Sequence, residues 1–155
     1  MKDEFKLLTD LAFSEAGKNK NFDEDVAGIA TVALNRAAKP ERFGATIEQV
    51  VFSPNQFSAI GGKEWEKTQS GQFTPEEERY YKRAAQIVSG VIKGTIKSKV
   101  GDADHYYNPK LANPSWAKVY PTVHDSGNHR FLKEVAVPLK PATGRKKRVS
   151  VQTVQ

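Results

Sequence analysis

Apolar residues recur at helical spacing through the first part of the chain, and the first such stretch covers residues 3–17. Leu8, Leu11 and Ala12 fall on a single face of the predicted helix. Glu15 follows Leu8 by seven residues and Leu11 by four, so it continues this apolar face. We therefore expect the Glu15 side chain to point into the protein.

Glu15 would lie in the last turn of this helix, where Gly17 can supply the C-terminal cap. Desolvation and the negative end of the helix dipole both raise the pKa of a carboxyl group in that place. A glutamic acid that stays protonated near neutral pH can act as a general acid. The alternative interpretation is an exposed glutamate at a frayed helix end, and the periodicity of this segment leaves both open.

A second helix is predicted from about residue 23 to residue 37, because Asn21 and Glu24 resemble a capping box. Its apolar stripe is wide enough for a central, buried helix. We interpret Asn35 and Arg36, at its end, as a C-terminal cap and a solvated charge. The stripe consists of Val26, Ile29, Ala30, Ala33, Leu34 and Ala37.

Three more helices are predicted before residue 95. Thr46 with Gln49 begins a short helix, and another is expected around residues 63–69. The segment Thr74-Pro75-Glu76-Glu77 combines a threonine cap, a proline in the first position and a glutamate in the third. That helix should run to about residue 92 and end near Gly94.

Beyond Val100 the helical periods give way to prolines and aromatic residues, which favours short strands and ordered loops. The segments His105-Tyr106-Tyr107-Asn108-Pro109 and Gly127-Asn128-His129-Arg130-Phe131 combine rings with amide side chains. Rings that face apolar sugar surfaces and amides that bind hydroxyl groups are typical of carbohydrate sites. The predicted fold class is α+β and mainly helical, with a C-terminal part rich in loops and short strands.

The net charge of +6 belongs to the end of the chain. Five basic residues and no acidic ones follow Glu134, which leaves +1 for residues 1–134. A nearly neutral body disfavours nucleic-acid binding, so no nucleic acid is expected as a partner. The basic segment instead suits an anionic wall polymer or membrane surface. The basic residues are Lys140, Arg145, Lys146, Lys147 and Arg148.

The length of 155 residues suggests one catalytic domain over residues 1–137, followed by a basic, flexible tail over 138–155. We expect a monomer. Charged residues interrupt the N-terminal segment, so no signal peptide is predicted and synthesis in a cytoplasm is expected. The absence of cysteine excludes disulfides and thiolate zinc sites.

Several chemistries are poorly supported. There is neither a cysteine nor a Gly-x-Ser-x-Gly elbow for a nucleophilic enzyme. The spacing of His105, His124 and His129 does not match a helical zinc motif, so no metal is expected. The sequence gives no sign of a cofactor.

A carboxylate mechanism on a glycoside fits better. Ordinary glycosidases need two acids, and Asp102, Asp104 or Asp125 could supply the second. One glutamate suffices when the substrate provides its own nucleophile, as an N-acetyl sugar with a free 6-hydroxyl group can. The glutamate then protonates the leaving oxygen and later accepts the proton of the hydroxyl group, and a 1,6-anhydro ring forms.

Six motifs in a fixed order resemble the SleB/CwlJ cell-wall hydrolase family, the spore-cortex-lytic type of catalytic domain, between about Leu7 and Phe131. The motifs are Ser14-Glu15-Ala16, Ala33-Leu34-Asn35-Arg36, Gln56-Phe57-Ser58, Tyr106-Tyr107-Asn108-Pro109, Asn113-Pro114 with Trp116-Ala117, and Gly127-Asn128-His129-Arg130-Phe131. The chain departs from the family in having Asp25-Val26 where members often have Gly-Gln.

The resemblance implies a lysozyme-like fold and a lytic transglycosylase that acts on peptidoglycan glycan strands at the MurNAc–GlcNAc β-1,4 bond. The family's catalytic glutamate falls on Glu15. The resemblance places Gln56, Phe57 and Ser58 along the substrate cleft, and Tyr106, Tyr107, Asn108 and His129 near the reacting sugar.

Two alternatives stay open. One is a hydrolytic muramidase on the same fold that uses Glu15, a second carboxylate such as Asp104, and a water molecule. The other is a wall-binding or nucleic-acid-binding module without catalysis. A compact form made in a cytoplasm suggests a bacteriophage lysis (endolysin) or virion-associated enzyme that acts at the bacterial cell wall.

Overall fold

The computed structural model describes residues 3–53 and 57–135 of the chain. Six α-helices come first, and a small antiparallel sheet with one turn of 3-10 helix follows, in agreement with the predicted α+β, mainly helical class. The helices are α1 (Glu4–Glu15), α2 (Phe22–Ala37), α3 (Pro40–Phe43), α4 (Ile47–Phe52), α5 (Lys63–Ser70) and α6 (Pro75–Lys93). The remaining elements are β1 (His105–Tyr107), the 3-10 helix Ser115–Lys118, β2 (Thr122–Asp125) and β3 (Arg130–Leu132).

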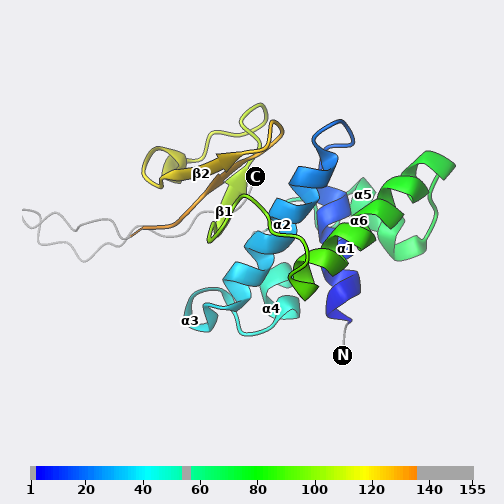
Figure 1. The fold of residues 1–155 in the computed structure, drawn as a ribbon, viewed down its shortest axis with the longest axis horizontal. Helices are drawn as coiled ribbons and strands as arrows, with labels where there is room; N and C mark the ends of the chain where they lie inside the picture. Colours follow the sequence, from blue (N-terminus) through cyan, green and yellow to red (C-terminus); the bar gives the residue numbers. More distant parts are fainter. Residues whose placement is uncertain (1–2, 54–56, 136–155) are drawn as a thin grey trace, which may run out of the picture.

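Helix α2 is the central element, as its wide apolar stripe predicted. It lies between the sheet on one side and helices α1 and α6 on the other (Figure 1). Helix and sheet come close together at Gly28, where an added Cβ atom would lie 2.6 Å from the Phe131 ring. A glycine on this face therefore lets strand β3 pack directly against the helix.

The sheet has the strand order β1-β3-β2, and both pairs are antiparallel. The inner face of β3 joins the main hydrophobic core, which also contains the buried residues of α1, α2, α4 and α6. A second, smaller core covers the other face of the sheet. It is formed by Tyr107, Trp116, Tyr120 and Leu132.

The predicted helix starts at Thr46 and Thr74 are confirmed, since both α4 and α6 begin with a complete capping box. The predicted end of α6 is confirmed as well, with Gly94 as its left-handed cap. Among the described residues no helix is both long enough and apolar enough to cross a bilayer.

Three predicted caps are wrong, and the first is Asn35, because α2 runs to Ala37 and its C-cap is Ala38. Helix α1 ends at Glu15 with Ala16 in extended conformation, so Gly17 is not its cap. Gly17 instead faces Asn128, whose Nδ2 would lie 2.7 Å from an added Cβ atom. Asn21 occupies the N-cap position of α2, but its side chain makes no capping hydrogen bond. Gly17 and Asn21 do not cap the helices because they lie where the α1–α2 turn contacts the β2–β3 turn.

The solvated charge predicted at Arg36 is also wrong, because this side chain is completely buried. Its Nε donates a hydrogen bond of 2.7 Å to the backbone oxygen of Asp104. The guanidinium group lies over the rings of Phe57 and Phe43, at 4.9 and 5.1 Å from their centroids. Arginine tolerates such a place because its flat cation packs on aromatic faces.

Candidate active site

Glu15 is the last residue of α1, and its side chain is turned toward the centre of the molecule, as the periodicity predicted. Its Oε2 accepts a hydrogen bond of 3.0 Å from the backbone N–H of Ala59, in the segment that follows α4. The residue keeps partial contact with solvent. A carboxyl group that is held by one backbone donor and still reaches solvent is suited to proton transfer.

The pKa of Glu15 is raised above its ordinary value, chiefly because burial removes the hydration of the charged form. The position at the C-terminus of α1 acts in the same direction, since the helix dipole disfavours a negative charge there. The Ala59 N–H, His129, Arg36 and Tyr106 all act against the rise. Burial prevails, so the protonated form persists to higher pH than in an ordinary glutamate.

The predicted site residues His129 and Tyr106 lie close enough to Glu15 to influence its ionisation. Their rings meet edge to face, with centroids 5.3 Å apart. Burial, and next the charge of Glu15, raises the pKa of Tyr106 well above its ordinary value, so the phenol keeps its proton. Tyr106 Oη makes no hydrogen bond of normal geometry among the described residues.

Phe57 is buried and packs against Tyr106, with ring centroids 6.2 Å apart. It thus anchors the segment whose next residues present the Ala59 N–H to Glu15. Arg36 lies beneath this ring, and burial lowers its pKa to about 10, so it remains a cation at neutral pH. The group around Glu15 therefore combines one carboxylic acid with a raised pKa and one arginine that is positively charged at neutral pH.

Among the other predicted site residues that the structure describes, Tyr107 is turned away from this group. Tyr107 lies in the second core, because successive residues of β1 point to opposite faces of the sheet. Asn108 Oδ1 accepts a hydrogen bond from the backbone N–H of Lys110 within a turn. Ser58 is exposed, and Gln56 lies outside the described residues.

Asp104, the second carboxylate of the hydrolytic alternative, is engaged in the structure elsewhere. Its Oδ1 accepts from His105 Nδ1 at 2.9 Å and from the backbone N–H of Glu134 at 2.8 Å, and its Oδ2 pairs with Lys39 Nζ at 2.7 Å. Burial alone would raise the pKa of Asp104, but these three partners hold it well below its usual range. Asp104 is thus part of a buried ion-pair network, and its role as a base that activates water stays a prediction. Asp102 and Asp125, the other two candidates, are exposed.

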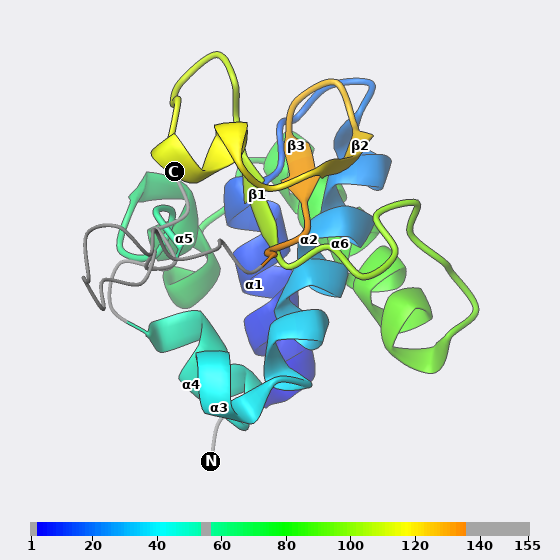
Figure 2. The ribbon, with the colours of Figure 1, turned by 90° about the vertical axis from the view of Figure 1, so that its left-hand side faces the viewer.

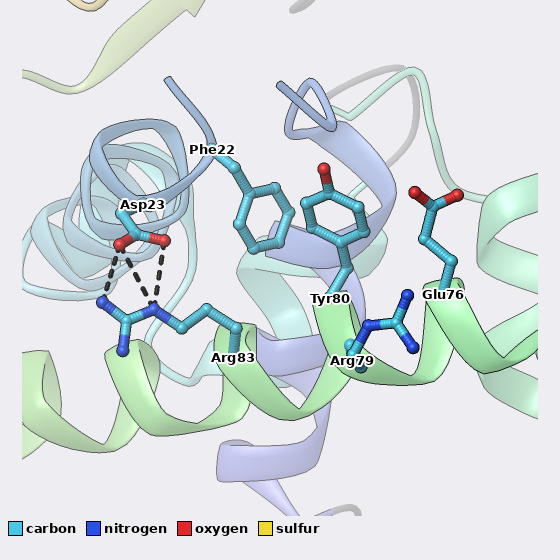
Figure 3. A pocket seen from close by; sticks show the side chains of 6 residues that line it. All are labelled: Phe22, Asp23, Glu76, Arg79, Tyr80 and Arg83. Atoms are coloured by element: carbon cyan, nitrogen blue, oxygen red, sulfur yellow. Dashed lines mark hydrogen bonds and ion pairs between the residues drawn. The ribbon is translucent and has the colours of Figure 1, made fainter. Parts of the chain in front are cut away.

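One pocket of about 270 Å³ lies elsewhere, between the start of α2 and helix α6 (Figure 3). Arg83 closes one side of it through an ion pair with Asp23, with 2.6 Å between Nη2 and Oδ2. Phe22 and Tyr80 meet edge to face at its base. None of its lining residues belongs to the Glu15 group. In the described part of the chain no three histidine, cysteine or acidic residues gather as metal ligands would.

Comparison with known proteins identifies the family. A family model described as Cell Wall Hydrolase matches residues 21–132. The chain belongs to this family. A cell wall hydrolase cleaves peptidoglycan, so the protein is an enzyme that acts on the bacterial wall. This membership sets aside the alternative of a non-catalytic binding module. No curated protein matches the chain significantly.

Two solved structures of cell wall hydrolases resemble the chain in fold. The catalytic domain of the germination-specific lytic transglycosylase SleB from Bacillus anthracis superposes with a TM-score of 0.63 at 23% identity, covering 86% of this chain and 96% of that one. The catalytic domain of the Bacillus cereus SleB protein gives a TM-score of 0.62 at 26% identity, with coverage of 84% and 89%. The predicted lysozyme-like fold of the SleB type is thereby confirmed.

The region matched by the family model begins at residue 21, six residues after Glu15. The placement of the acid therefore depends on helix α1 and on the contacts that Glu15 makes with Ala59, His129 and Tyr106. Sequence reasoning missed two residues of this environment, Arg36 and Asp25. For Arg36 the available signal was its place at the end of the most apolar helix of the chain.

Proposed function

We propose that this cell wall hydrolase is a lytic transglycosylase that cleaves the MurNAc–GlcNAc β-1,4 bond with Glu15 as its single acid and base. The observation that carries the proposal is the raised pKa of a partly exposed glutamate that binds the Ala59 N–H, combined with the engagement of the buried carboxylates Asp25 and Asp104 in other interactions. The likeness in fold to the SleB lytic transglycosylase domain supports the same conclusion.

The first step would be protonation of the glycosidic oxygen by the Glu15 carboxylic acid, as the bond from that oxygen to C1 of MurNAc breaks. The Glu15 carboxylate left behind is stabilised by the Ala59 N–H and by the positive charge of Arg36. It then accepts the proton of the MurNAc 6-hydroxyl group while the 6-oxygen bonds to C1. The product is a 1,6-anhydro ring, Glu15 is protonated again, and no water is consumed.

A hydrolytic reaction would need a second carboxylate that can activate water. Asp104 is occupied by Lys39, His105 and the Glu134 backbone. Asp25 is completely buried, and its two oxygens accept from Ser126, Asn128 and Gly17. Neither carboxylate has an oxygen left for a water molecule near a sugar, which favours the transglycosylase over the muramidase.

Product masses test the proposal directly. Digestion of purified peptidoglycan should release soluble fragments lighter than the hydrolysis products by the mass of one water molecule, and mass spectrometry reads this difference. Reduction with borohydride provides the control, because an anhydro end cannot be reduced whereas a hydrolytic reducing end can. Reducible fragments of full hydrolytic mass would show a muramidase instead.

We also propose that the basic tail over residues 138–155, which lies outside the described residues, holds a catalytic domain of residues 1–137 to an anionic wall polymer or membrane surface. Deletion of the tail should weaken binding to isolated walls at low ionic strength, and the difference should disappear as added salt screens the charges. Binding that is the same with and without the tail at every salt concentration would exclude this role.

A further inference from the structure

Asp25 is a buried carboxylate that the proposed reaction does not use. It lies in the first turn of α2 and is completely inaccessible to solvent. Burial alone would raise the pKa of Asp25, but hydrogen bonding to His129, Ser126 and Asn128 outweighs burial and lowers it. Asp25 is therefore ionised at neutral pH, and a buried charge persists only where its partners are fixed.

The partners of Asp25 come from two turns that are far apart in the sequence. Its Oδ1 accepts a short hydrogen bond from Ser126 Oγ, and its Oδ2 accepts from Asn128 Nδ2 at 2.8 Å and from the Gly17 backbone N–H at 3.2 Å. Asn19 and Asn128 exchange two further hydrogen bonds, of 2.9 and 3.0 Å. The α1–α2 turn and the β2–β3 turn therefore lie side by side beyond the start of α2 (Figure 2).

The fourth partner of Asp25 is His129, whose Nδ1 lies 3.2 Å from Asp25 Oδ2. No hydrogen bond of normal geometry joins the two atoms, but an ionised carboxylate can only accept, so a proton on this nitrogen is favoured over a lone pair that faces the charge. His129 is itself buried, and the ring of Tyr106 meets it edge to face. The imidazole ring is thus held between the Asp25 carboxylate and the Tyr106 ring, and it lies within electrostatic range of Glu15.

We propose that Asp25 and His129 form a positioning pair for Glu15, in which the buried aspartate holds the imidazole ring beside the catalytic acid in one orientation. The pair rests on the proposed role of Glu15. In this proposal His129 acts on Glu15, whereas the family resemblance placed it near the reacting sugar. The groups that act on the pKa of Glu15 are the Ala59 N–H, His129, Arg36 of α2 and Tyr106 of β1, and among them His129 is the one that lies against Asp25.

Steady-state kinetics of Asp25→Asn and His129→Gln on soluble glycan fragments separate positioning from binding. Each variant should lower kcat by about 10- to 100-fold with KM nearly unchanged, since a misplaced catalytic group costs a factor of that order. The double variant should lower kcat no further than the more damaging of the two single substitutions does, because both remove the same pair. A raised KM with an unchanged kcat in His129→Gln would instead place His129 on the substrate and overturn the pair.

The pH profile adds a readout that a merely structural role would not move. His129 lowers the pKa of Glu15, so its removal should raise that pKa and shift the alkaline limb of the kcat profile to higher pH. Arg36 and Tyr106 remain in place in this variant and continue to lower the pKa. A drop in kcat with no shift of the limb would contradict electrostatic support by His129.

Nitrogen NMR of the imidazole ring tests the pair without any activity measurement. In the wild type, Nδ1 of His129 should carry a proton beside the Asp25 carboxylate, and Asp25→Asn should shift the Nδ1 resonance because the facing negative charge is lost. Asp23→Asn is the matched control, because it makes the same charge change at an exposed position of the same helix and should leave the His129 signals as they are. Identical His129 signals in wild type and Asp25→Asn would overturn the pair.

The failure of this inference is distinguishable from the failure of the proposed function. If Glu15→Gln is inactive but the Asp25 and His129 variants keep wild-type kcat and pH profile, the transglycosylase stands and the pair is wrong. If Glu15→Gln is active, the acid is wrong, and the NMR experiment still decides whether Asp25 holds His129.

Discussion

Glu15→Gln is expected to reduce peptidoglycan cleavage by at least about 10²- to 10⁴-fold, the contribution usual for a positioned acid–base group. Glutamine keeps the size of the side chain and can still accept from the Ala59 N–H, but it can neither give nor take the proton. Release of soluble fragments from purified peptidoglycan measures the loss. Because Glu15 serves both half-reactions in the proposed mechanism, neither anhydro nor hydrolytic products should remain.

The same substitution is expected to increase stability at neutral pH. The folded-state pKa of Glu15 is raised, so folding disfavours its charged form. That cost is fully present above the folded pKa and disappears below the unfolded pKa, where the group is protonated in both states. Urea unfolding of wild type and Glu15→Gln should therefore diverge at neutral pH and converge in acid.

Glu66→Gln provides the matched control, since it makes the same change at an exposed position on α5. It should alter neither the activity nor the dependence of stability on pH. Wild-type activity in Glu15→Gln would show that helix α1 does not carry the acid. A stability curve parallel to that of the wild type would show that burial of Glu15 does not raise its pKa.

The sequence predicted those features of the molecule that depend on neighbours within a few residues. The capping boxes Thr46–Gln49 and Thr74–Glu77 are complete within four positions, so the starts of α4 and α6 could be predicted. Glu15 could be placed in the interior because helical periodicity decides which face it shares. The four-residue helix α3 was missed, since Pro40 signals the end of α2 and gives no apolar period of its own.

The environment of Glu15 was beyond prediction because its polar contacts join distant segments. Asp25 and Ser126 are 101 positions apart in the sequence, and Arg36 is 68 positions from the backbone oxygen of Asp104. Local rules assign such residues to caps and solvated surfaces, which are their commoner places. The alternation of a strand was open to prediction: adjacent residues face opposite sides, so Tyr106 and Tyr107 belong to different cores.

Asp104→Ala is expected to lower the free energy of unfolding by about 3 kcal/mol, the usual loss when one partner is removed from a buried ion pair. The carboxylate is only 1% exposed and joins three separate parts of the chain through Lys39, His105 and the Glu134 backbone. Its removal leaves the buried Nδ1 of His105 and the Glu134 N–H without an acceptor. Urea unfolding at neutral pH measures the loss.

The pH dependence of the free energy of unfolding shows whether the Asp104 charge causes the loss of stability. The folded-state pKa of Asp104 is depressed, so its stabilisation is present above the unfolded pKa of about 3.9 and is lost as the pH falls through the lower folded value. The difference between wild type and Asp104→Ala should therefore shrink below about pH 4. Asp102→Ala removes an exposed aspartate two residues earlier and should change stability by no more than about 0.5 kcal/mol.

Activity per folded molecule completes the test of Asp104. The variant keeps the backbone oxygen that binds Arg36, so the support beneath Phe57 and Glu15 stays in place. Under the transglycosylase mechanism, Asp104→Ala should cleave peptidoglycan at nearly the wild-type rate wherever it is folded. A muramidase with Asp104 as its base would instead lose about 10²- to 10⁴-fold. A large loss in kcat from a folded variant would therefore return Asp104 to the mechanism, whereas a stability defect alone would exclude Asp104 as the base of a hydrolytic reaction.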